Sequence, residues 1–348
     1  MFFLYPLAAI LQRSLVGDAG LDLGPFRSVL GDSYYLGRIW FTIWQALVST
    51  LLTLAVGLPA AYLFAKYEFR GKMLLKSVTT VPFMMPTIVV AMGFVALFGS
   101  QGVVNTTLMD LFDLDAPPVR ITNTLTIIFM AHAFYNYAIV VRIVSALWSN
   151  LAPALEETAK VLGAGHARTF YHVTLPLLLP AITSAAMLAF AFSFTSFGVV
   201  LILGGAQFAT VEVAIYELTT KLFRLPLAGA LSVIQLVFTY LFLLLYARFQ
   251  DRAAVRVDLK AREATVRRQM GAGHRLFILG MVLVLLAIAI PSFQLLTAQY
   301  SPPEEPKLTV KATGNQWNWD YEYQFEQPFS FNSAILADAD RAGLGKED

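Results

Sequence analysis

The chain has 348 residues, of which 57% are hydrophobic and only 14% are charged, and its mean hydropathy is +0.63. Soluble domains carry about 25% charged residues, so this composition excludes an ordinary soluble fold and indicates a polytopic membrane protein. The net charge of +2 does not indicate a protein that binds nucleic acid. The absence of cysteine excludes disulfides, zinc–thiolate sites and cysteine nucleophiles.

The chain opens on an apolar stretch at residues 2–11, which is shorter than the roughly 20 residues needed to cross a bilayer. No basic segment precedes this stretch, so no cleavable signal peptide is predicted. We expect instead that it is a partial first span whose beginning is missing.

Longer apolar runs follow and predict transmembrane helices, because lipid leaves a single segment no other way to satisfy its backbone polar groups. Pro82 and Pro86 are expected to bend the second of these helices. The predicted spans are residues 40–64, 74–98, 123–142, 177–203, 226–247 and 276–296.

Basic residues gather in the loops at 66–76, 143–172 and 248–275 and are sparse in the loops between them. The positive-inside rule therefore predicts that these three loops are cytoplasmic. The basic run that ends at Arg275 is interpreted as a solvated linker, with contact to anionic lipid as the alternative.

After Leu296 the chain becomes polar and proline-rich, and residues 308–311 predict a strand that enters a small extramembrane β domain. The predicted fold class is an all-α polytopic membrane protein with a short β-leaning extramembrane C-terminal tail. The predicted regions are a transmembrane domain at 1–255, a basic cytoplasmic linker at 256–275, an additional transmembrane helix at 276–296 and a periplasmic tail at 297–348.

The cytoplasmic loop 143–176 predicts a short helix, a turn and a second helix. Gly163 is the expected C-terminal stop of the first helix, and Glu156 and Lys160 are an i,i+4 pair on one face of it. The opposite face is apolar and suits a soluble partner. It consists of Leu151, Leu155, Ala159 and Leu162.

This loop resembles the signature of ABC importer permeases, which reads Glu-Ala-Ala, three residues, Gly, nine residues and Ile-x-Leu-Pro. Thr158 replaces the first alanine, Val173 replaces isoleucine, and the spacing fits throughout. The resemblance implies a type I ABC importer transmembrane domain in the bacterial inner membrane, with this loop docked into a cleft of an ATPase subunit. An ordinary solvated helix–turn–helix is the alternative. The residues implied to couple the ATPase are Glu157, Thr158, Ala159, Gly163, Leu175 and Pro176.

Residues 203–205, 209–216 and 131–136 are similar to thiamine permeases, with the ferric-iron permeases as the nearest competitor. That branch carries two such halves in one chain, and residues 1–280 resemble only the first half. The implied partners are an ABC ATPase, a periplasmic solute-binding protein and a second permease half or a second copy, and no nucleic acid. The resemblance also implies that ATP is bound by the partner and that this chain is not an enzyme. Because only one of the two halves is present, we expect the chain to import nothing alone.

His132 and Asn136 lie four residues apart in one predicted span, and ionisable groups at such depth favour a functional role. An interhelical hydrogen bond is the equally weighted alternative. If the solute is a cationic heterocycle, Glu212 or Glu217 and the faces of aromatic rings are candidates to attract it. Phe190, Phe194 and Phe197 follow a helical spacing that more often means packing.

Residues 287–296 and the aromatic segment 314–323 resemble cytochrome c oxidase subunit II. In that family Trp317 would lie where cytochrome c delivers electrons, and an aromatic β-domain core is the alternative. The dinuclear copper site needs cysteines and histidines, but this chain has no cysteine and no histidine after His274, so the site is absent. The alternative functions are therefore a truncated electron-transfer subunit or a non-functional fusion product.

Overall fold

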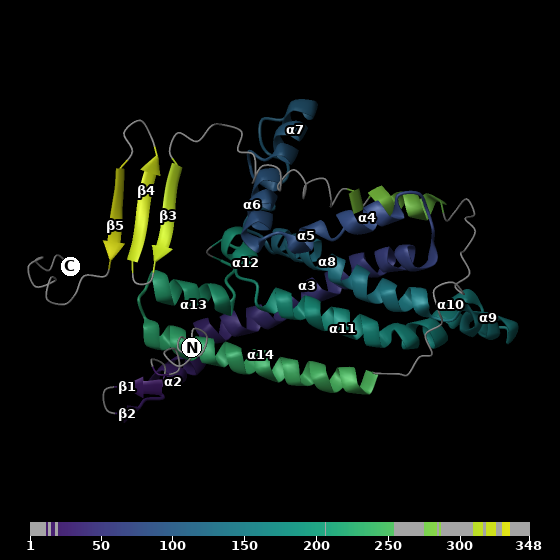
Figure 1. Ribbon diagram of the computed structural model, residues 1–348, viewed down its shortest axis with the longest axis horizontal. Coiled ribbons are helices and arrows are strands. Elements are labelled where there is room, and N and C mark those ends of the chain that lie inside the picture. Colours follow the sequence, from purple (N-terminus) through teal and green to yellow (C-terminus); the bar gives the residue numbers. More distant parts are fainter. Residues whose placement is uncertain are drawn as a thin grey trace, which may run out of the picture. The chain divides into compact units, whose positions relative to one another are not determined.

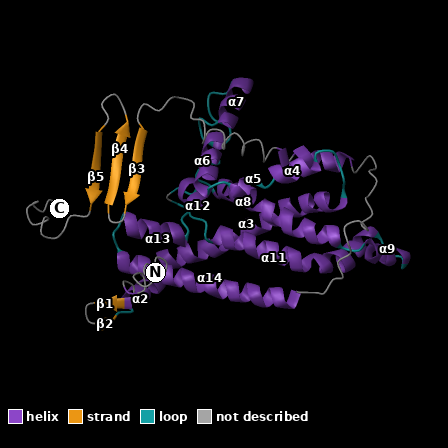
Figure 2. Cartoon of the chain, viewed as in Figure 1, coloured by secondary structure: helices purple, strands orange, loops and turns teal. Residues whose placement is uncertain are grey.

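The computed structural model describes two compact units, which span Met1–Leu296 and Thr297–Asp348. Figure 1 traces the described helices and strands in chain order, and Figure 2 separates helices from strands. The described residues are 12, 15–17, 20–205, 207–253, 275–283, 285–286, 309–315, 318–324 and 329–334.

Long apolar helices form the first unit and run side by side (Figure 1). Five helical segments among the described residues are long and apolar enough to cross a membrane. The predictions of spans at 40–64, 123–142, 177–203 and 226–247 are confirmed in type, although each helix has its own bounds. The four longest helices are α3 (Ser33–Lys66), α8 (Leu125–Asn150), α11 (Leu175–Phe194) and α14 (Leu225–Ala253).

The predicted span 74–98 is not one helix but a broken series. Met85 has extended backbone (φ −77°, ψ 143°) because it precedes Pro86, which disfavours helical geometry in the residue before it. The bend expected at the prolines is therefore confirmed as a full break. The series consists of α4 (Lys72–Val78), α5 (Val81–Met84) and α6 (Thr87–Phe98), and α7 (Val103–Phe112) follows beyond the predicted span.

The predicted span 177–203 is also interrupted, because α11 ends at Phe194 and a separate helix α12 spans Gly198–Leu203. The carbonyl of Ser193 accepts a hydrogen bond from the Gln45 side chain at 2.8 Å, which satisfies a backbone oxygen at the end of α11. A further helix, α13 (Val211–Thr220), separates α12 from α14.

Small residues let the central helices approach closely. A Cβ added at Gly57 of α3 would lie 2.6 Å from the Cβ of Val140 of α8, a distance that real side chains do not adopt. Ala61, Ala181 and Ala185 join Val140 in one buried cluster between α3, α8 and α11. Such small-residue contacts are the usual means of helix association in membranes.

Elements at both ends of the first unit flank the long helices. The N-terminal side holds β1 (Val16–Gly17), β2 (Gly20–Leu21) and α2 (Gly24–Gly31). A helical segment at 275–283 and 285–286 packs Ile278 and Leu285 against Leu63, Tyr67 and Tyr137. The rest of the predicted helix 276–296 lies outside the described residues.

The second unit contains a three-stranded antiparallel sheet with the order β3-β4-β5. The strands are β3 (Thr309–Asn315), β4 (Asn318–Gln324) and β5 (Phe329–Ala334). Their registers pair Ala312 with Tyr321, and Tyr321 in turn with Phe331. The prediction of a strand at 308–311 is confirmed for residues 309–311.

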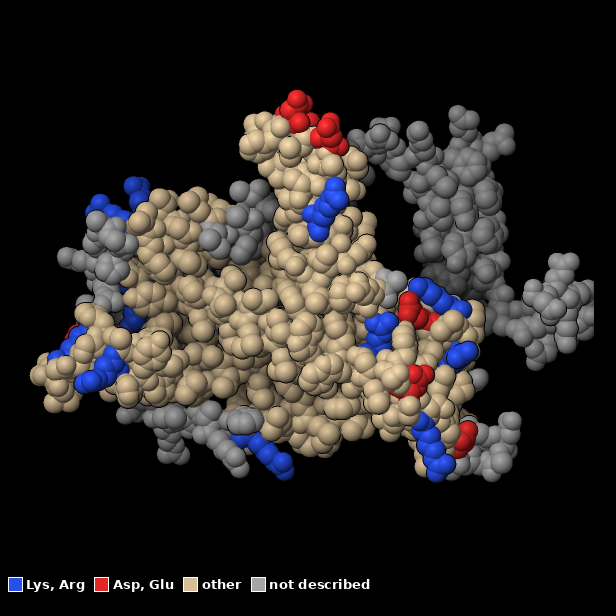
Figure 3. Space-filling view, turned by 180° about the vertical axis from the view of Figure 1, so that it is seen from behind, with Lys and Arg blue, Asp and Glu red and all other residues tan. Residues whose placement is uncertain are grey.

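Charged side chains avoid the middle of the helical unit. On the face shown in Figure 3, Lys, Arg, Asp and Glu lie at the two ends of the helical unit, on a projecting part and at one place on the lower edge, and the described surface between them is largely free of charge. Such a belt fits the hydrocarbon core of a bilayer.

Candidate functional site

The loop 143–176 folds as a helix, a tight turn and a second helical stretch, which confirms its predicted form. α9 spans Pro153–Val161, and α10 (His166–Thr169) leads through a π-helical turn, η1 (Phe170–Thr174), directly into α11. Gly163 adopts the left-handed conformation (φ +86°), and the amide of Ala164 donates to the Ala159 carbonyl at 3.0 Å. Gly163 is thus the C-terminal stop that the sequence predicts.

The signature residues of this loop face solvent. Glu157, Thr158 and Gly163 are exposed, and Ala159 is half-buried. A Cβ added at Gly163 would meet no described atom within 4 Å, so this chain requires glycine there for its backbone conformation and not for space. At the other end of the signature, Leu175 is half-buried and Pro176 is exposed.

An apolar tip extends from this loop. Val161 and Leu162 are 87% and 82% exposed, and Leu155 is 43% exposed. No side chain of α9 is buried. Exposed apolar surface between charged residues is typical of sites that contact another protein.

Glu156 does not pair with Lys160 as the sequence predicts. Its Oε1 instead receives a salt bridge from Lys66 Nζ at 2.8 Å and a hydrogen bond from the Thr174 hydroxyl at 3.2 Å. The prediction was wrong because a partner 90 residues away in sequence is closer than the one on the next turn.

A second group of polar side chains lies buried between the long helices, and His132 of α8 is at its centre. The Nδ1 atom of His132 lies 2.9 Å from the hydroxyl of Ser49 of α3. Its Nε2 atom lies 2.8 Å from the hydroxyl of Ser196, which follows α11. His132 therefore links three parts of the bundle, in agreement with the hydrogen-bonding alternative of the sequence analysis.

Asn136 and Gln45 extend this buried group. Asn136 donates to the hydroxyl of Ser193 at 3.2 Å, and Gln45 donates to the Ser193 carbonyl at 2.8 Å. The Oδ1 atom of Asn136 and the Oε1 atom of Gln45 have no hydrogen-bond partner within the described part of the chain. Buried acceptors without a partner are rare in proteins, so these oxygens are candidates for contact with a solute or water.

The start of α13 is tied to the same group. The amide of Val211 donates to the Thr42 hydroxyl at 2.9 Å, and the Thr210 hydroxyl donates to the Ser196 carbonyl at 3.3 Å. Glu212 follows directly and accepts a 2.6 Å hydrogen bond from Gln235 of α14. Burial raises the pKa of the Glu212 carboxyl, and the hydrogen bond from Gln235 opposes part of that rise.

Glu217, the other acidic candidate, stands apart from this group. Its carboxylate pairs with Lys221 at 3.2 Å on the same helix, and the lysine is largely exposed. The structure thus brings His132, Asn136 and the start of α13 together through hydrogen bonds, whereas Glu217 makes a local surface pair.

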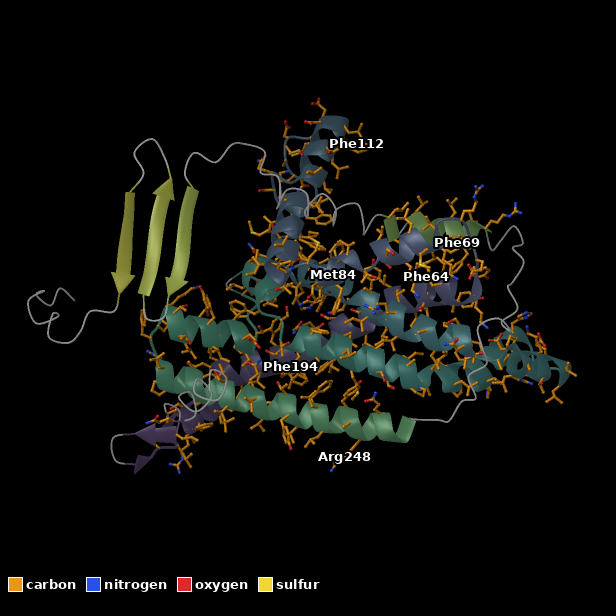
Figure 4. The ribbon with its side chains drawn as sticks, in the orientation of Figure 1. Phe64, Phe69, Met84, Phe112, Phe194 and Arg248 are labelled. Atoms are coloured by element: carbon orange, nitrogen blue, oxygen red, sulfur yellow. The ribbon has the colours of Figure 1, made fainter. Side chains whose placement is uncertain are left out.

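The phenylalanines of α11 pack against α14 and line a cavity of about 240 Å³ between the two helices. The rings of Phe190 and Phe242 lie 4.6 Å apart, and Phe194 stacks on Phe190 at 5.7 Å. Figure 4 labels Phe194 at this position between the ribbons. Phe197 contacts Tyr216 instead at 5.3 Å, so the three phenylalanines do not form one cage.

Several of these polar residues were missed by sequence reasoning. Thr42, Gln45, Ser49 and Thr53 recur at helical spacing along α3, and all four are buried. A polar stripe in an otherwise apolar span was the signal that could have found them. Trp317, the candidate remnant for electron entry, lies outside the described residues.

The chain matches the sequence model of the family described as "Binding-protein-dependent transport system inner membrane component" over residues 37–257. The matching sequences include a 2-aminoethylphosphonate transport system permease protein of Salmonella typhimurium, which is 26% identical over 73% of this chain and 89% of that protein. The sulfate transport system permease protein of Escherichia coli is 29% identical over 74% of this chain and 90% of that protein.

The thiamine transport system permease protein of Brucella abortus is 31% identical over 69% of this chain, but the match spans only 45% of that protein. Among solved structures, a bacterial ABC transporter that imports the acidic polysaccharide alginate has a similar fold, with a TM-score of 0.61 at 18% identity. That match covers 73% of this chain and 91% of the alginate transporter chain.

Proposed function

The chain belongs to the family of binding-protein-dependent transport system inner membrane components, and we propose that its loop 143–176 is the element that couples it to ATP hydrolysis. It is a multi-pass inner-membrane permease subunit of an ABC importer and not an enzyme. Its partners are an ABC ATPase, a periplasmic solute-binding protein and a second permease subunit.

The exposed apolar tip of α9 is the observation that supports this coupling role. Val161 and Leu162 project from a turn that Gly163 shapes, and no side chain of α9 is buried against the bundle. The signature residues Glu157, Thr158, Ala159, Gly163, Leu175 and Pro176 are proposed to form the ATPase contact.

Gly163→Asp tests this role. An aspartate at φ +86° strains the turn and adds a charge beside the apolar tip. Membrane insertion should persist, whereas co-purification of the ATPase and uptake should be lost. Normal uptake by this variant, in proteoliposomes with a second permease half, the ATPase and the binding protein, would show that the loop is not the coupling element.

For the solute we propose thiamine or a related small molecule. The match to the Brucella thiamine permease supports this choice, and the half-buried carboxylate of Glu212 suits a cationic heterocycle. Similarity to permeases named for sulfate and for 2-aminoethylphosphonate makes those anions the competing choices. Uptake assays with each radiolabelled solute decide between them, and uptake of an anion but not of thiamine would refute the proposal.

The path for the solute is proposed to pass His132 and Asn136 and then Glu212, with Glu217 at its edge. The free oxygens of Asn136 and Gln45 support this path, because a polar solute would satisfy them. Asn136→Ala should raise the solute concentration needed for half-maximal uptake. An unchanged concentration dependence with a lower maximal rate would assign Asn136 to bundle packing instead.

We propose that transport needs two permease halves facing one another, because the chain spans about half the length of the thiamine permease it matches. The second half is either another chain or a second copy in a two-fold arrangement. Uptake by this chain with only its ATPase and binding protein would establish the second copy as sufficient.

For residues 284–348 we propose an origin similar to the start of cytochrome c oxidase subunit II, joined to the permease through the basic linker 256–275. The antiparallel sheet of β3, β4 and β5 supports a small β unit in this segment. Because the chain lacks cysteine, purified protein should hold no stoichiometric copper and show no thiolate–copper absorption. Two tightly bound copper ions per chain would contradict this proposal.

A further inference from the structure

Among the described residues, few contacts hold α9 in place. None of the side chains from Pro153 to Val161 is buried, so apolar packing does not fix the helix against the bundle. Its side chains form mostly local bonds, such as the Thr158 hydroxyl to the Ala154 carbonyl at 2.7 Å. The position of α9 therefore depends on the few contacts that leave the helix.

The Glu156 carboxylate is the principal polar contact of that kind. Its Oε1 lies 2.8 Å from Lys66 Nζ and 3.2 Å from the Thr174 hydroxyl. Lys66 is the last residue of α3, and Thr174 is the last residue of η1 before α11 begins. One carboxylate thus joins α9 to the end of one long helix and to the beginning of another.

The contact between Glu156, Lys66 and Thr174 is partly shielded from solvent. The side chains of Lys66 and Glu156 are 19% and 26% exposed, and Thr174 is buried. Partial burial makes loss of one partner costly, because the other charge keeps its desolvation penalty without its compensation. An exposed ion pair would contribute far less.

Aromatic rings connect η1, which carries Thr174, with α8 and α3. Phe170 of η1 lies 6.3 Å from the ring of Trp148, and Trp148 lies 5.2 Å from Tyr62 of α3. The π-helical turn that carries Thr174 interrupts the α-helical hydrogen-bond pattern, and such turns often occur at functional positions. These rings therefore belong to the bundle, whereas α9 is attached to it mainly through Glu156.

We propose that Glu156, Lys66 and Thr174 are positioning residues that transmit a displacement of α9 to α3 and α11. This inference rests on the proposed coupling role of the loop. When the partner protein moves α9, the carboxylate carries that movement to two membrane helices at once. Without it, α9 can move while the bundle stays still.

Glu156→Gln removes the charge and keeps the side-chain size. In proteoliposomes with a second permease half, the ATPase and the binding protein, the amount of solute moved per ATP hydrolysed should fall about fivefold or more, which is the lower end of the usual range for coupling between two sites. Exchanging the charges in Lys66→Glu with Glu156→Lys should restore a large part of the coupling. If Glu156→Gln lowered coupling only because the protein misfolds, this exchange of charges would not restore it.

Glu68→Gln is the matched control. Glu68 pairs with Lys72 at 2.9 Å at the same end of the bundle, but this pair lies within one short segment and does not reach α9. The control should leave solute moved per ATP unchanged. Thr174→Val keeps both charges and removes one hydrogen bond, so it should lower the solute moved per ATP less than Glu156→Gln does. It replaces Glu156→Gln as the test if that variant does not fold.

A spin label on Ala164→Cys measures the attachment of the loop without any transport, since the chain is free of cysteine. The label should become more mobile with Glu156→Gln and not with Glu68→Gln. Equal mobility in both would overturn the inference even if the protein transports nothing. With a second permease half also supplied, absence of uptake by the unsubstituted protein would contradict the proposed function, whereas normal coupling in Glu156→Gln would contradict only this inference.

Discussion

Replacing Gly57 with alanine should show how much of the stability of the bundle depends on close contact between α3 and α8. The added Cβ would lie 2.6 Å from Val140 Cβ and 2.7 Å from its Cγ1. Val140 is fully buried in the cluster between α3, α8 and α11, so its side chain has no free space to enter. The helices must therefore separate or tilt.

The expected magnitude follows from two opposing effects. Alanine is favoured over glycine within a helix by roughly 0.5–1 kcal/mol, and overpacking a tight core costs about 1–3 kcal/mol. Gly37 lies in the same helix, but a Cβ added there would meet no described atom within 4 Å, so Gly37→Ala experiences only the first effect. The difference between the two variants therefore isolates the packing cost, about 1–3 kcal/mol.

Unfolding in detergent, followed by heat or denaturant, measures this difference. Val140→Ala should remove the clash, so Gly57→Ala should become neutral or stabilising in that background, which is the signature of direct coupling in a double-mutant cycle. If Gly57→Ala is as stable as Gly37→Ala in the native background, the close approach of α3 and α8 is refuted.

His132→Ala should lower the free energy of unfolding by about 1–3 kcal/mol because it leaves the Ser49 and Ser196 hydroxyls unpaired; an unchanged unfolding midpoint would refute this. A cysteine at Ala164 should not react with an impermeant thiol reagent added to intact cells; its labelling would reverse the predicted orientation. The folded pKa of Glu212 lies above its ordinary value of 4.5, so the stability it contributes is complete below pH 4.5 and is lost as the pH rises through the folded pKa. Glu212→Gln should remove that decline, and an unaltered pH profile would show that burial does not perturb this carboxyl.

The order and type of the membrane helices could be predicted from sequence because hydropathy over about 20 residues reflects the thickness of a bilayer. Interruptions within the helices were harder to predict from the sequence. The break at Pro86 follows from a local steric rule, and the bend there was predicted. The end of α11 at Phe194 was not predicted, since it depends on Gln45, a residue 148 positions away that bonds to the Ser193 carbonyl.

In the candidate sites too, local features could be predicted from the sequence, whereas contacts between distant residues could not. Gly163 and its turn were predictable because the left-handed conformation is a local property of glycine. The partner of Glu156 was not, because an i,i+4 rule considers only neighbours on one helix, and Lys66 reaches the carboxylate from the end of another. His132 was singled out correctly as a buried polar residue, but its two serine partners come from different parts of the bundle and carry no local signal.

In the proposed coupling role, the loop 143–176 must meet two requirements that usually oppose one another. A surface that binds a partner must stay exposed, so α9 buries no side chain and gains no stability from apolar packing. A surface that transmits force must nevertheless be attached to the bundle. A half-buried carboxylate satisfies both, because it attaches the helix through charge-assisted bonds while the apolar tip at Val161 and Leu162 stays exposed. In this proposal, the acidic residue beside the family signature matters for coupling as much as the signature itself.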